Sequence, residues 1–357
     1  MFRKIDHIEY CVGNAFVTAY FFTYALGFKS LAQAGLETGQ RDRQSFVVQQ
    51  GDIRLVFTNS LSTGGPVADH VRRHGDSIRD VAFLVDDAAR AFDRCLAAGA
   101  EPIQEPTWLA GSPGSAPVRR AAVRTFGDTI HSLIQRPSET GEFLPGYQPW
   151  ELFRPPHAGG LTAVDHVACC VEQGALGRWM DFYERAFGFH EMHHEDIVTD
   201  RSAMNSKVVQ SENGAVKLPL MEPAHGHGRS QIDEYLDYHD GAGAQHLALL
   251  SSDIATTVRT LRAGGLQALR TPGVYYDGLR DRVGPIDEDV EMLRDLGVLV
   301  DRDAWGYLLQ VFTRPVTGRP TGFLEVVQRK GARGFGGGNV RALFEAVERE
   351  QAARGNL

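Results

Sequence analysis

The segment Val164–Val171 (VDHVACCV) repeats the segment Ile5–Val12 (IDHIEYCV) near the start of the chain. Apolar residues dominate both copies, which is typical of a buried strand. An aromatic-rich segment of helical character follows each copy and ends in Gly-Phe, at Gly27-Phe28 and at Gly188-Phe189. Glycine commonly ends a helix. The two copies lie about 160 residues apart, so the sequence predicts two related halves.

Two further pairs of segments extend the repeat. Gly75–Phe83 matches Gly241–Leu249, and an acidic residue opens a predicted helix after each of them. Ile130–Arg136 matches Phe323–Arg329, and both copies end in Gln-Arg. Each half therefore contains two strand–helix–strands units, and the predicted fold class is α+β.

The boundary between the halves follows from composition. Residues 139–160 are rich in Pro and Gly, as linkers and loops are. We expect an N-terminal domain at residues 1–140, a linker at 141–160 and a C-terminal domain at 161–357.

Composition excludes several classes of function. The 357 residues hold 37 Lys and Arg against 45 Asp and Glu, a net charge of −8, without a basic block. Binding to nucleic acid or to an anionic membrane is therefore not expected. No apolar run is long enough for a membrane span or a signal peptide, so we expect a cytoplasmic protein. The four cysteines form no C-x-x-C pair, so neither a disulfide framework nor a thiolate metal site is expected.

Three polar residues stand at equivalent strand positions of the second half: His166, His246 and Glu325. Two histidines and one carboxylate on one face of a metal form the facial triad of non-haem Fe(II) oxygenases, which leaves positions open for substrate and O₂. A lone polar residue in an apolar strand is costly unless it is paired or bound to a metal. The first half carries a different set at the corresponding positions: His7, Asp80 and Ser132.

The second half also contains segments that the first half lacks. It is 27 residues longer between its second and third candidate ligands, around Val274–Trp305, and insertions of this kind often lie near a working face. The tail Asn339–Glu350 reads as an amphipathic helix with Asn339 as N-cap, behind a glycine-rich hinge at Gly331–Gly338. This helix is either a lid or a packed terminal helix.

Other patterns have simpler interpretations. The histidine-rich stretches His190–Asp196 and His225–Gly228 are expected to be solvated surface. Neither a dinucleotide-binding loop nor a Gly-x-Ser-x-Gly nucleophile elbow is present.

The C-terminal half carries motifs that resemble one family, the 4-hydroxyphenylpyruvate-using dioxygenases of the vicinal oxygen chelate fold. This family includes 4-hydroxyphenylpyruvate dioxygenase and 4-hydroxymandelate synthase. The resemblance covers nearly the whole chain and is strongest after Asp165. The motifs that carry it are Ser230–Tyr235, Gly241–His246, Tyr275-Tyr276, Gly306–Thr313, Phe323–Glu325, Gly334–Gly336 and Arg354–Leu357.

The resemblance implies a fold and a set of site residues. The fold would be two tandem βαβββ-repeat domains, each an open barrel-like sheet with flanking helices, plus a C-terminal lid helix. His166, His246 and Glu325 would bind Fe(II), with the keto acid of an arylpyruvate and O₂ in the open positions. The implied catalytic amides are Gln231, Gln245 and Gln310. The implied substrate-binding residues are Ser202, Pro219, Met221, Ser230, Phe312 as an aromatic wall, Phe335 at the lid and Val340. A homo-oligomer, a dimer or tetramer, is also implied.

The family's two enzymes differ in product, and two positions favour 4-hydroxymandelate with CO₂ over homogentisate. Where the homogentisate-forming enzymes typically have Pro-Ile-Asn and Gly-Asn-Phe, this chain ends the corresponding motifs in Met221 and Val340. Met221 cannot replace a polar amide, and Val340 removes an aromatic ring. Ala203–Ser206 and Gly273–Tyr276 also resemble the mandelate-forming branch, whereas Ser202, Pro219, Ser230 and Arg354–Leu357 resemble the other branch.

Several alternatives stay open. The runner-up is the homogentisate-forming reaction of 4-hydroxyphenylpyruvate dioxygenase. A modified or unsubstituted arylpyruvate as substrate would also suit a less polar pocket. Extradiol cleavage of a catechol uses the same ligands, and a ligand-binding protein of the same fold that is not an enzyme is the remote alternative.

Overall fold

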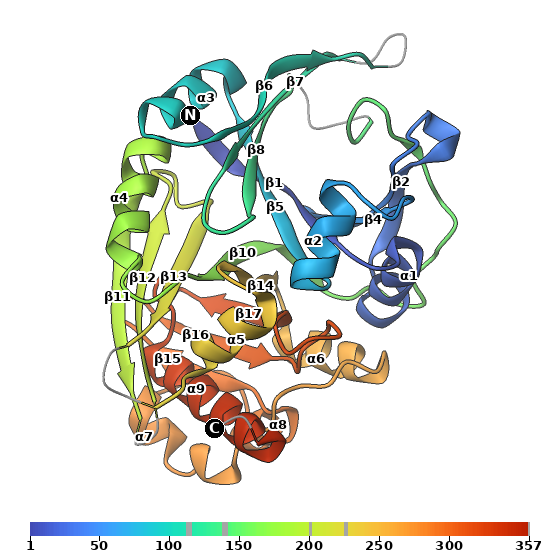
Figure 1. Cartoon of the computed structure of the whole chain (residues 1–357). Helices are drawn as coiled ribbons and strands as arrows, with labels where there is room; N and C mark the ends of the chain where they lie inside the picture. Colours follow the sequence, from blue (N-terminus) through green and yellow to red (C-terminus); the bar gives the residue numbers. More distant parts are fainter. Residues whose placement is uncertain (112–115, 138–141, 200–201, 225–227, 356–357) are drawn as a thin grey trace.

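The computed structural model describes residues 1–111, 116–137, 142–199, 202–224 and 228–355 (Figure 1). Its N-terminal half consists of two successive βαβββ units. The first contains β1 (Phe2–Cys11), α1 (Ala15–Leu26), β2 (Lys29–Ala34), η1 (Leu36–Thr38), β3 (Arg43–Gln50) and β4 (Ile53–Ser60). Helix α2 (Pro66–His74) leads to the second, which contains β5 (Ser77–Val85), α3 (Ala88–Ala97), β6 (Pro102–Leu109), β7 (Val118–Arg124) and β8 (Ile130–Gln135). A short strand, β9 (Gln148–Pro149), follows.

The C-terminal half repeats this order. Its first unit contains β10 (Leu161–Cys170), α4 (Leu176–Phe187), β11 (His190–Val198), β12 (Ala203–Gln210) and β13 (Lys217–Pro223). Helix α5 (Gln231–His239) leads to β14 (Gly243–Ser251), α6 (Ile254–Ala263), β15 (Leu299–Arg302), β16 (Tyr307–Phe312) and β17 (Phe323–Lys330). The additional elements are η2 (Gly273–Tyr275), α7 (Leu279–Val283), α8 (Val290–Leu296) and the C-terminal α9 (Gly337–Arg354). The α+β fold and the insertion around Val274–Trp305 are confirmed.

Local sequence explains where the repeated helices begin and end. Helix α1 begins after Asn14, whose side chain accepts from Val17 N at 3.0 Å. Both α1 and α4 end at a glycine in the left-handed region, Gly27 with φ of 79° and Gly188 with φ of 71°. At Gly27 a Cβ atom would also lie 2.5 Å from the backbone nitrogen of Gly159. Glycine therefore permits both the turn and the close passage of the linker.

The strands of each half pair in the same order. Hydrogen bonding gives β2-β3-β4-β1-β5-β8-β7-β6 in the first half and β11-β12-β13-β10-β14-β17-β16-β15 in the second. The sheets of the two halves join near the starts of the central strands β5 and β14, where Ile78 pairs with Ala244. Apolar side chains from both halves form one core that continues across this junction.

The strand register confirms the internal repeat. In the first half Asp80 lies opposite Ile130, and in the second half His246 lies opposite Phe323. The residue two positions after each partner is Ser132 in β8 and Glu325 in β17. Side chains two residues apart point to the same face of a strand, so Ser132 and Glu325 occupy equivalent positions.

Two segments have contacts that the sequence did not predict. The linker predicted at 141–160 packs on the N-terminal half, where β9 pairs with β2 and the side chains of Trp150 and Phe153 are buried in the core. Helix α9 begins at Gly337, so Asn339 lies inside its first turn and is not the N-cap. The Asn339 side chain is fully buried and points toward the C-terminal sheet, where it contacts Gln310.

Other expectations fare as follows. The stretch His190–Asp196 belongs to strand β11 and is only partly solvated, because exposed residues alternate with half-buried ones and His193 stacks on Phe335 with centroids 6.1 Å apart. His225 and His227 lie outside the described residues. All four cysteines are buried and free, and Cys169 and Cys170 point into different apolar clusters on opposite faces of β10. In the described part of the chain, no helix is both long and apolar enough to cross a membrane.

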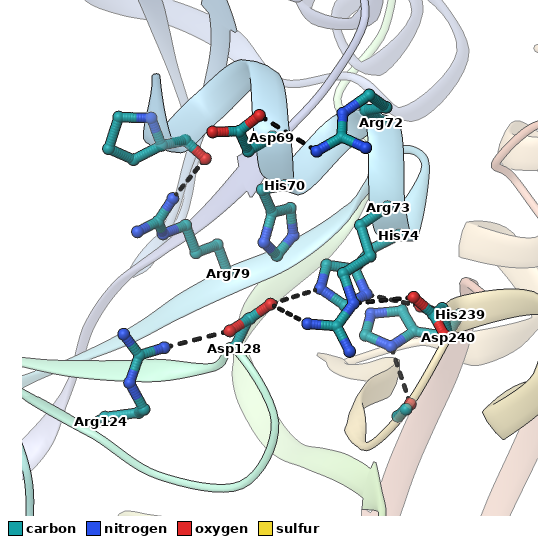
Figure 2. A network of polar contacts seen from close by, with 12 residues as sticks. Asp69, His70, Arg72, Arg73, His74, Arg79, Arg124, Asp128, His239 and Asp240 are labelled. Carbon is teal, nitrogen blue, oxygen red and sulfur yellow. Dashed lines mark hydrogen bonds and ion pairs between the residues drawn. The ribbon is translucent and has the colours of Figure 1, made fainter. Parts of the chain in front are cut away.

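A cluster of histidines joins the two halves where α2 packs against α5 (Figure 2). The rings of His74 and His239 stack with centroids 4.3 Å apart, and His70 lies 4.6 Å from His74. His74 Nδ1 contacts the backbone carbonyl of His239, and His74 Nε2 lies 2.9 Å from Asp128. Burial lowers the pKa of His70 to about 2 and that of His239 to about 4, so both rings are neutral at pH 7.

This cluster predicts that the protein loses stability in mild acid. Unfolded histidine has a pKa of ~6.5, so below that pH the unfolded chain binds protons that folded His70 and His239 do not. The free energy of unfolding should therefore keep the full contribution of these two histidines above pH ~6.5 and fall as the pH is lowered toward 4. At pH 5 the loss should be about 2 kcal/mol per histidine. Urea unfolding at pH 7.5 and pH 5 measures this slope.

Two variants test whether the histidine cluster causes this pH dependence of the free energy of unfolding. His239→Gln should flatten the pH dependence of unfolding, whatever its effect on stability at pH 7.5. His194→Gln alters an exposed histidine and should leave the slope unchanged. An unchanged slope in His239→Gln would contradict the assignment.

Candidate metal centre

Three side chains from three adjacent strands of the C-terminal sheet converge on one point. His166 lies on β10, His246 on β14 and Glu325 on β17, and all three are buried. Their donor atoms lie within 4.8 Å of one another, and no other group of this kind occurs in the part of the chain that the structure describes. The structure therefore brings together the three ligands predicted from the sequence.

The spacing of the donor atoms suits a six-coordinate metal. Glu325 Oε2 lies 3.2 Å from His166 Nε2 and 3.5 Å from His246 Nε2. Two adjacent ligands that each lie ~2.1 Å from a metal are separated by about 3 Å, so small movements would place all three atoms on one ion. Burial opposes the charged form of Glu325, but His166 and His246 outweigh it and lower its pKa to about 2. The carboxylate is therefore ionised and fit for a cation.

Hydrogen bonds fix the orientation of both imidazole rings. His166 Nδ1 lies 2.8 Å from Asp165 Oδ1, and His246 Nδ1 lies 3.2 Å from Gln245 Oε1. Because these partners accept hydrogen bonds, each ring donates from Nδ1 and directs Nε2 toward Glu325 and the candidate metal position, where a bound metal would replace any proton on Nε2. Asp165 in turn accepts from Arg329, at 2.6 and 2.8 Å. Burial would raise the pKa of Asp165, but Arg329 and His166 hold it far below its usual range.

The carboxylate is oriented by an amide. Gln310 Nε2 donates to Glu325 Oε1 at 2.8 Å, which leaves Glu325 Oε2 facing the two histidines. Gln310 is buried in β16, next to the strand that carries Glu325. Each of the three candidate ligands thus has a hydrogen-bond partner on the side away from the metal position.

Aromatic rings enclose the candidate ligands. Phe335 lies over His166 with ring centroids 5.0 Å apart, Phe323 stacks on His246 at 4.6 Å, and Phe312 contacts the edge of His246 at 6.4 Å. The rings exclude water from the ligands, which strengthens their electrostatic interactions.

The amides and aromatic residues predicted for the pocket reach it to different degrees. Gln310 contacts a ligand directly, and Gln245 contacts His246. Gln231 opens helix α5 and lines a cavity of about 680 Å³ together with Gln245 and Phe323. The described lining of this cavity includes Gln245 and Phe323, which contact His246, but none of the three candidate ligands.

Met221 and Val340 meet in one apolar cluster. Met221 is buried on β13 beside Cys170, and Val340 packs against the same cluster from α9. Strand β10 contributes Ala168 and Cys170, which share a face with His166 because side chains alternate along a strand. The apolar wall therefore continues from the candidate metal ligands along the same face of the sheet. Pro219 is buried on the same strand as Met221.

Two predicted substrate-binding serines have structural partners instead. Ser230 is the N-cap of α5, and its hydroxyl contacts Asp233 Oδ2 at 2.7 Å in a capping box. Ser202 donates to Glu348 of α9 at 2.5 Å. Both hydroxyls thus hold helices in place in this structure, and neither contacts the candidate ligands.

Four residues near this site are not recognisable as site residues from the sequence. Phe323 belongs to a family motif, Asp165 and Arg329 belong to the repeat, and Asn339 suits a helix cap. The repeat itself contains a signal for the pair Asp165 and Arg329. In both halves, Asp-His occurs in the first strand and Gln-Arg ends the last one.

The N-terminal half preserves the surroundings of this centre around different side chains. Asp6 lies 2.7 Å from His7 Nδ1 and accepts from Arg136 at 2.8 Å, as Asp165 does with His166 and Arg329. Phe143 covers His7 at 5.2 Å, as Phe335 covers His166.

The remaining positions of the N-terminal copy differ in charge. Arg120 occupies the position equivalent to Gln310, and its guanidinium lies 3.0 Å from Ser132 Oγ and 3.6 Å from Asp80 Oδ2. This guanidinium provides a fixed positive charge beside Asp80, which opposes the binding of a metal cation there.

Known proteins resemble this chain along its whole length. Residues 3–144 match the family model of hydroxyphenylpyruvate dioxygenase, N-terminal, and residues 163–311 match that of the glyoxalase/bleomycin resistance protein/dioxygenase superfamily. The 4-hydroxyphenylpyruvate dioxygenase of Yarrowia lipolytica is 42% identical over 372 residues, spanning 100% of this chain and 94% of the relative. The enzyme of that name from Danio rerio is 41% identical over 370 residues, spanning 100% and 92%.

A solved structure is similarly close. A triple mutant of 4-hydroxymandelate synthase from Streptomyces coelicolor superposes with a TM-score of 0.88 at 42% identity, covering 98% of this chain and 99% of that one. The chain therefore belongs to the family of 4-hydroxyphenylpyruvate dioxygenase and 4-hydroxymandelate synthase, with two tandem vicinal oxygen chelate domains, and it is an enzyme.

Proposed function

We propose that this enzyme binds Fe(II) at His166, His246 and Glu325 and converts 4-hydroxyphenylpyruvate and O₂ into 4-hydroxymandelate and CO₂. The geometry of the three donor atoms supports the metal. Relatives named as 4-hydroxyphenylpyruvate dioxygenases support the substrate. The apolar cluster that contains Met221 and Val340 is the observation that favours 4-hydroxymandelate.

The facial arrangement of three protein ligands suits this substrate. When bound, Fe(II) would supply the oxygen chemistry, and a set of three protein ligands on one side would leave room for the keto acid and O₂. Gln245 and Asp165 hold the two imidazoles in the tautomer that binds a metal, and Gln310 holds the carboxylate. Phe335 and Phe312 keep water away from the reacting atoms. The share of the protein is therefore orientation and exclusion of water.

The pose of the aromatic ring decides the product. 4-Hydroxymandelate and homogentisate are isomers, because one oxygen atom enters either the benzylic carbon or the ring and the other enters the keto acid. An amide at position 221 would give a polar group of the substrate a partner, and a phenyl ring at position 340 would press on the substrate ring. Met221 and Val340 do neither, so the benzylic carbon is expected to meet the oxidant.

Product analysis tests this proposal. The pure protein is loaded with Fe(II) and given 4-hydroxyphenylpyruvate, ascorbate and O₂. Because the products have equal masses, they must be separated by chromatography before detection. 4-Hydroxymandelate is expected as the main product. Homogentisate as the main product would make the second member of the family the correct assignment, and O₂ uptake with a catechol but without CO₂ release would indicate extradiol cleavage.

Variants connect the product to the apolar wall. The double variant Met221→Asn, Val340→Phe is expected to increase the share of homogentisate by about tenfold, the effect of ~1.4 kcal/mol between two competing transition states. The double variant Met221→Leu, Val340→Leu keeps the wall aliphatic and should keep the product of the unmodified enzyme. An equal product ratio in all three proteins would show that this wall does not control the outcome.

We further infer that the enzyme is a homo-oligomer. Helix α1 contains no charged residue, and its outward face exposes five large apolar or aromatic side chains: Phe16, Val17, Tyr20, Phe21 and Tyr24. The equivalent helix α4 carries four charged residues among its twelve. A contiguous exposed apolar face of this kind commonly marks an association surface. Light scattering by the pure protein, with Val17→Glu as the disrupting variant, measures the oligomeric state.

A further inference from the structure

A chain of buried hydrogen bonds connects Glu325 to the inserted segment of the C-terminal half. Glu325 Oε1 accepts from Gln310 Nε2 at 2.8 Å, and Gln310 Oε1 faces Asn339 Nδ2 at 2.7 Å. Asn339 Oδ1 in turn faces the hydroxyl of Tyr275 at 2.7 Å. The four residues lie on β17, β16, α9 and η2, so the chain crosses four elements.

Chemistry fixes the direction of the bond between Gln310 and Glu325. Gln310 Nε2 faces two acceptors, the Glu325 carboxylate and the backbone carbonyl of Phe335 at 3.3 Å. Its Oε1 must therefore face Asn339, which has to present its Nδ2 as the donor. The Tyr275 hydroxyl lies 2.7 Å from the Asn339 amide, accepts from Val300 N at 2.9 Å and lies 2.9 Å from Val300 O, so Asn339 and the Val300 carbonyl share its single proton. The Asn339 amide also lies 3.1 Å from Val300 O and 3.2 Å from Asp301 N, so backbone groups of β15 enclose this part of the chain.

The chain passes through the segment that covers the candidate metal centre. Phe335 lies over His166, and Gly336 follows it with φ of 73°. A Cβ atom at Gly336 would lie 2.8 Å from Gln310 Oε1, so the cover passes directly against the amide. The Gly338 amide also donates to Asp301 at 2.7 Å. The start of α9 is therefore held closed by groups from β15, β16 and η2.

We propose that Tyr275 is a positioning residue that couples closure of the C-terminal helix to the orientation of Glu325. When α9 is closed, Tyr275 holds Asn339, Asn339 holds Gln310, and Gln310 presents Glu325 Oε2 to the metal position. When α9 opens, Asn339 leaves Gln310, and the carboxylate loses its fixed orientation. The complete ligand geometry thus forms only under a closed cover. This inference rests on the proposed function, because it assigns the chain to the same metal centre.

The neighbouring tyrosine offers a matched control. Tyr275 is partly buried and Tyr276 is buried, and the Tyr276 hydroxyl does not belong to the chain that reaches Glu325. Both tyrosine rings contact an arginine, Arg282 over Tyr275 at 4.5 Å and Arg294 over Tyr276 at 5.5 Å. Phenylalanine keeps either ring and removes only the hydroxyl. Tyr275→Phe therefore breaks the chain, whereas Tyr276→Phe does not.

Hydrogen exchange of the metal-free protein provides the first measurement. In Tyr275→Phe, backbone amides between residues 334 and 340 are expected to exchange about fivefold to tenfold faster, the factor that corresponds to the loss of about one net hydrogen bond. Tyr276→Phe is expected to match the unmodified protein. Equal exchange in Tyr275→Phe and the unmodified protein would overturn the proposal.

Absorption by bound Co(II) provides the second measurement, because its bands depend on ligand geometry. Tyr275→Phe is expected to shift these bands, Asn339→Ala to shift them in the same way, and the double variant to show no further shift, as expected of residues that act as one unit. Unshifted bands in Tyr275→Phe, or additive shifts in the double variant, would reduce Tyr275 to a structural role. Neither measurement needs substrate or O₂. Both can therefore contradict the role of Tyr275 while the proposed reaction stands, and both can support that role while the proposed reaction fails.

Discussion

Replacement of Glu325 by alanine is expected to abolish iron binding and turnover together. The variant removes the one anionic donor of the candidate centre and leaves two neutral imidazoles, which cannot balance the charge of a divalent ion. Loss of an outer-shell partner alone typically costs ~10–100-fold in metal affinity, so loss of a ligand should cost at least ~100-fold. The expected metal content after loading and desalting falls from one iron per chain to a trace.

The internal repeat provides the control for this variant. Ser132 occupies the position of Glu325 in the N-terminal half, where it contacts Asp80 at 2.5 Å. Ser132→Ala should lower stability by about 1 kcal/mol through loss of a hydrogen bond and should leave the iron content at one per chain. Metal analysis and competition with a chelator measure both proteins. Unchanged iron affinity in Glu325→Ala would show that Glu325 is not a ligand.

Asp165→Asn is expected to combine a large loss of stability with a loss of iron affinity. The Asp165 carboxylate is buried between His166 and the Arg329 guanidinium, and the variant leaves that guanidinium without its counter-charge. Breaking a buried ion pair by removing one partner costs ~3–5 kcal/mol. Because Asp165 also orients His166, iron affinity should fall by ~10–100-fold.

Asp6→Asn separates these two effects. Asp6 holds His7 and the buried Arg136 as Asp165 holds His166 and Arg329. The two variants should therefore lose stability to a similar extent, but only Asp165→Asn should lose iron affinity. Urea unfolding of the metal-free proteins measures the first quantity, and chelator competition at low temperature, where both proteins are folded, measures the second. Equal iron affinity in the two variants would contradict the role of Asp165.

Hydrophobic periodicity and the internal repeat predict most of the fold. They predict the apolar strands, the helices that end at Gly27 and Gly188, and the repeated segments that follow them, because each of these depends on residues close together in the chain. Contacts between segments far apart in the chain could not be predicted. The linker contributes Trp150 and Phe153 to the core, and Asn339, which the sequence suggested as an N-cap, lies inside α9 with its side chain against Gln310.

The three candidate ligands could also be predicted from the sequence, for a physical reason. A buried strand tolerates few polar side chains, so His166, His246 and Glu325 stood out against apolar neighbours. Their equivalence could be inferred because the other half repeats the same strands. The choice between Fe(II) and another metal, and between two isomeric products, depends on the family resemblance and on Met221 and Val340.

The sequence by itself determined two related halves, one of which holds two histidines and a carboxylate on adjacent strands. Only the tertiary structure decided how the surrounding polar groups are used. Ser230 and Ser202 hold helices, whereas Asn339 and Tyr275 connect to Glu325 through Gln310. These partners lie far apart in the chain. A hydrogen bond requires atoms within about 3 Å in the right direction, and that geometry arises only when distant elements pack together.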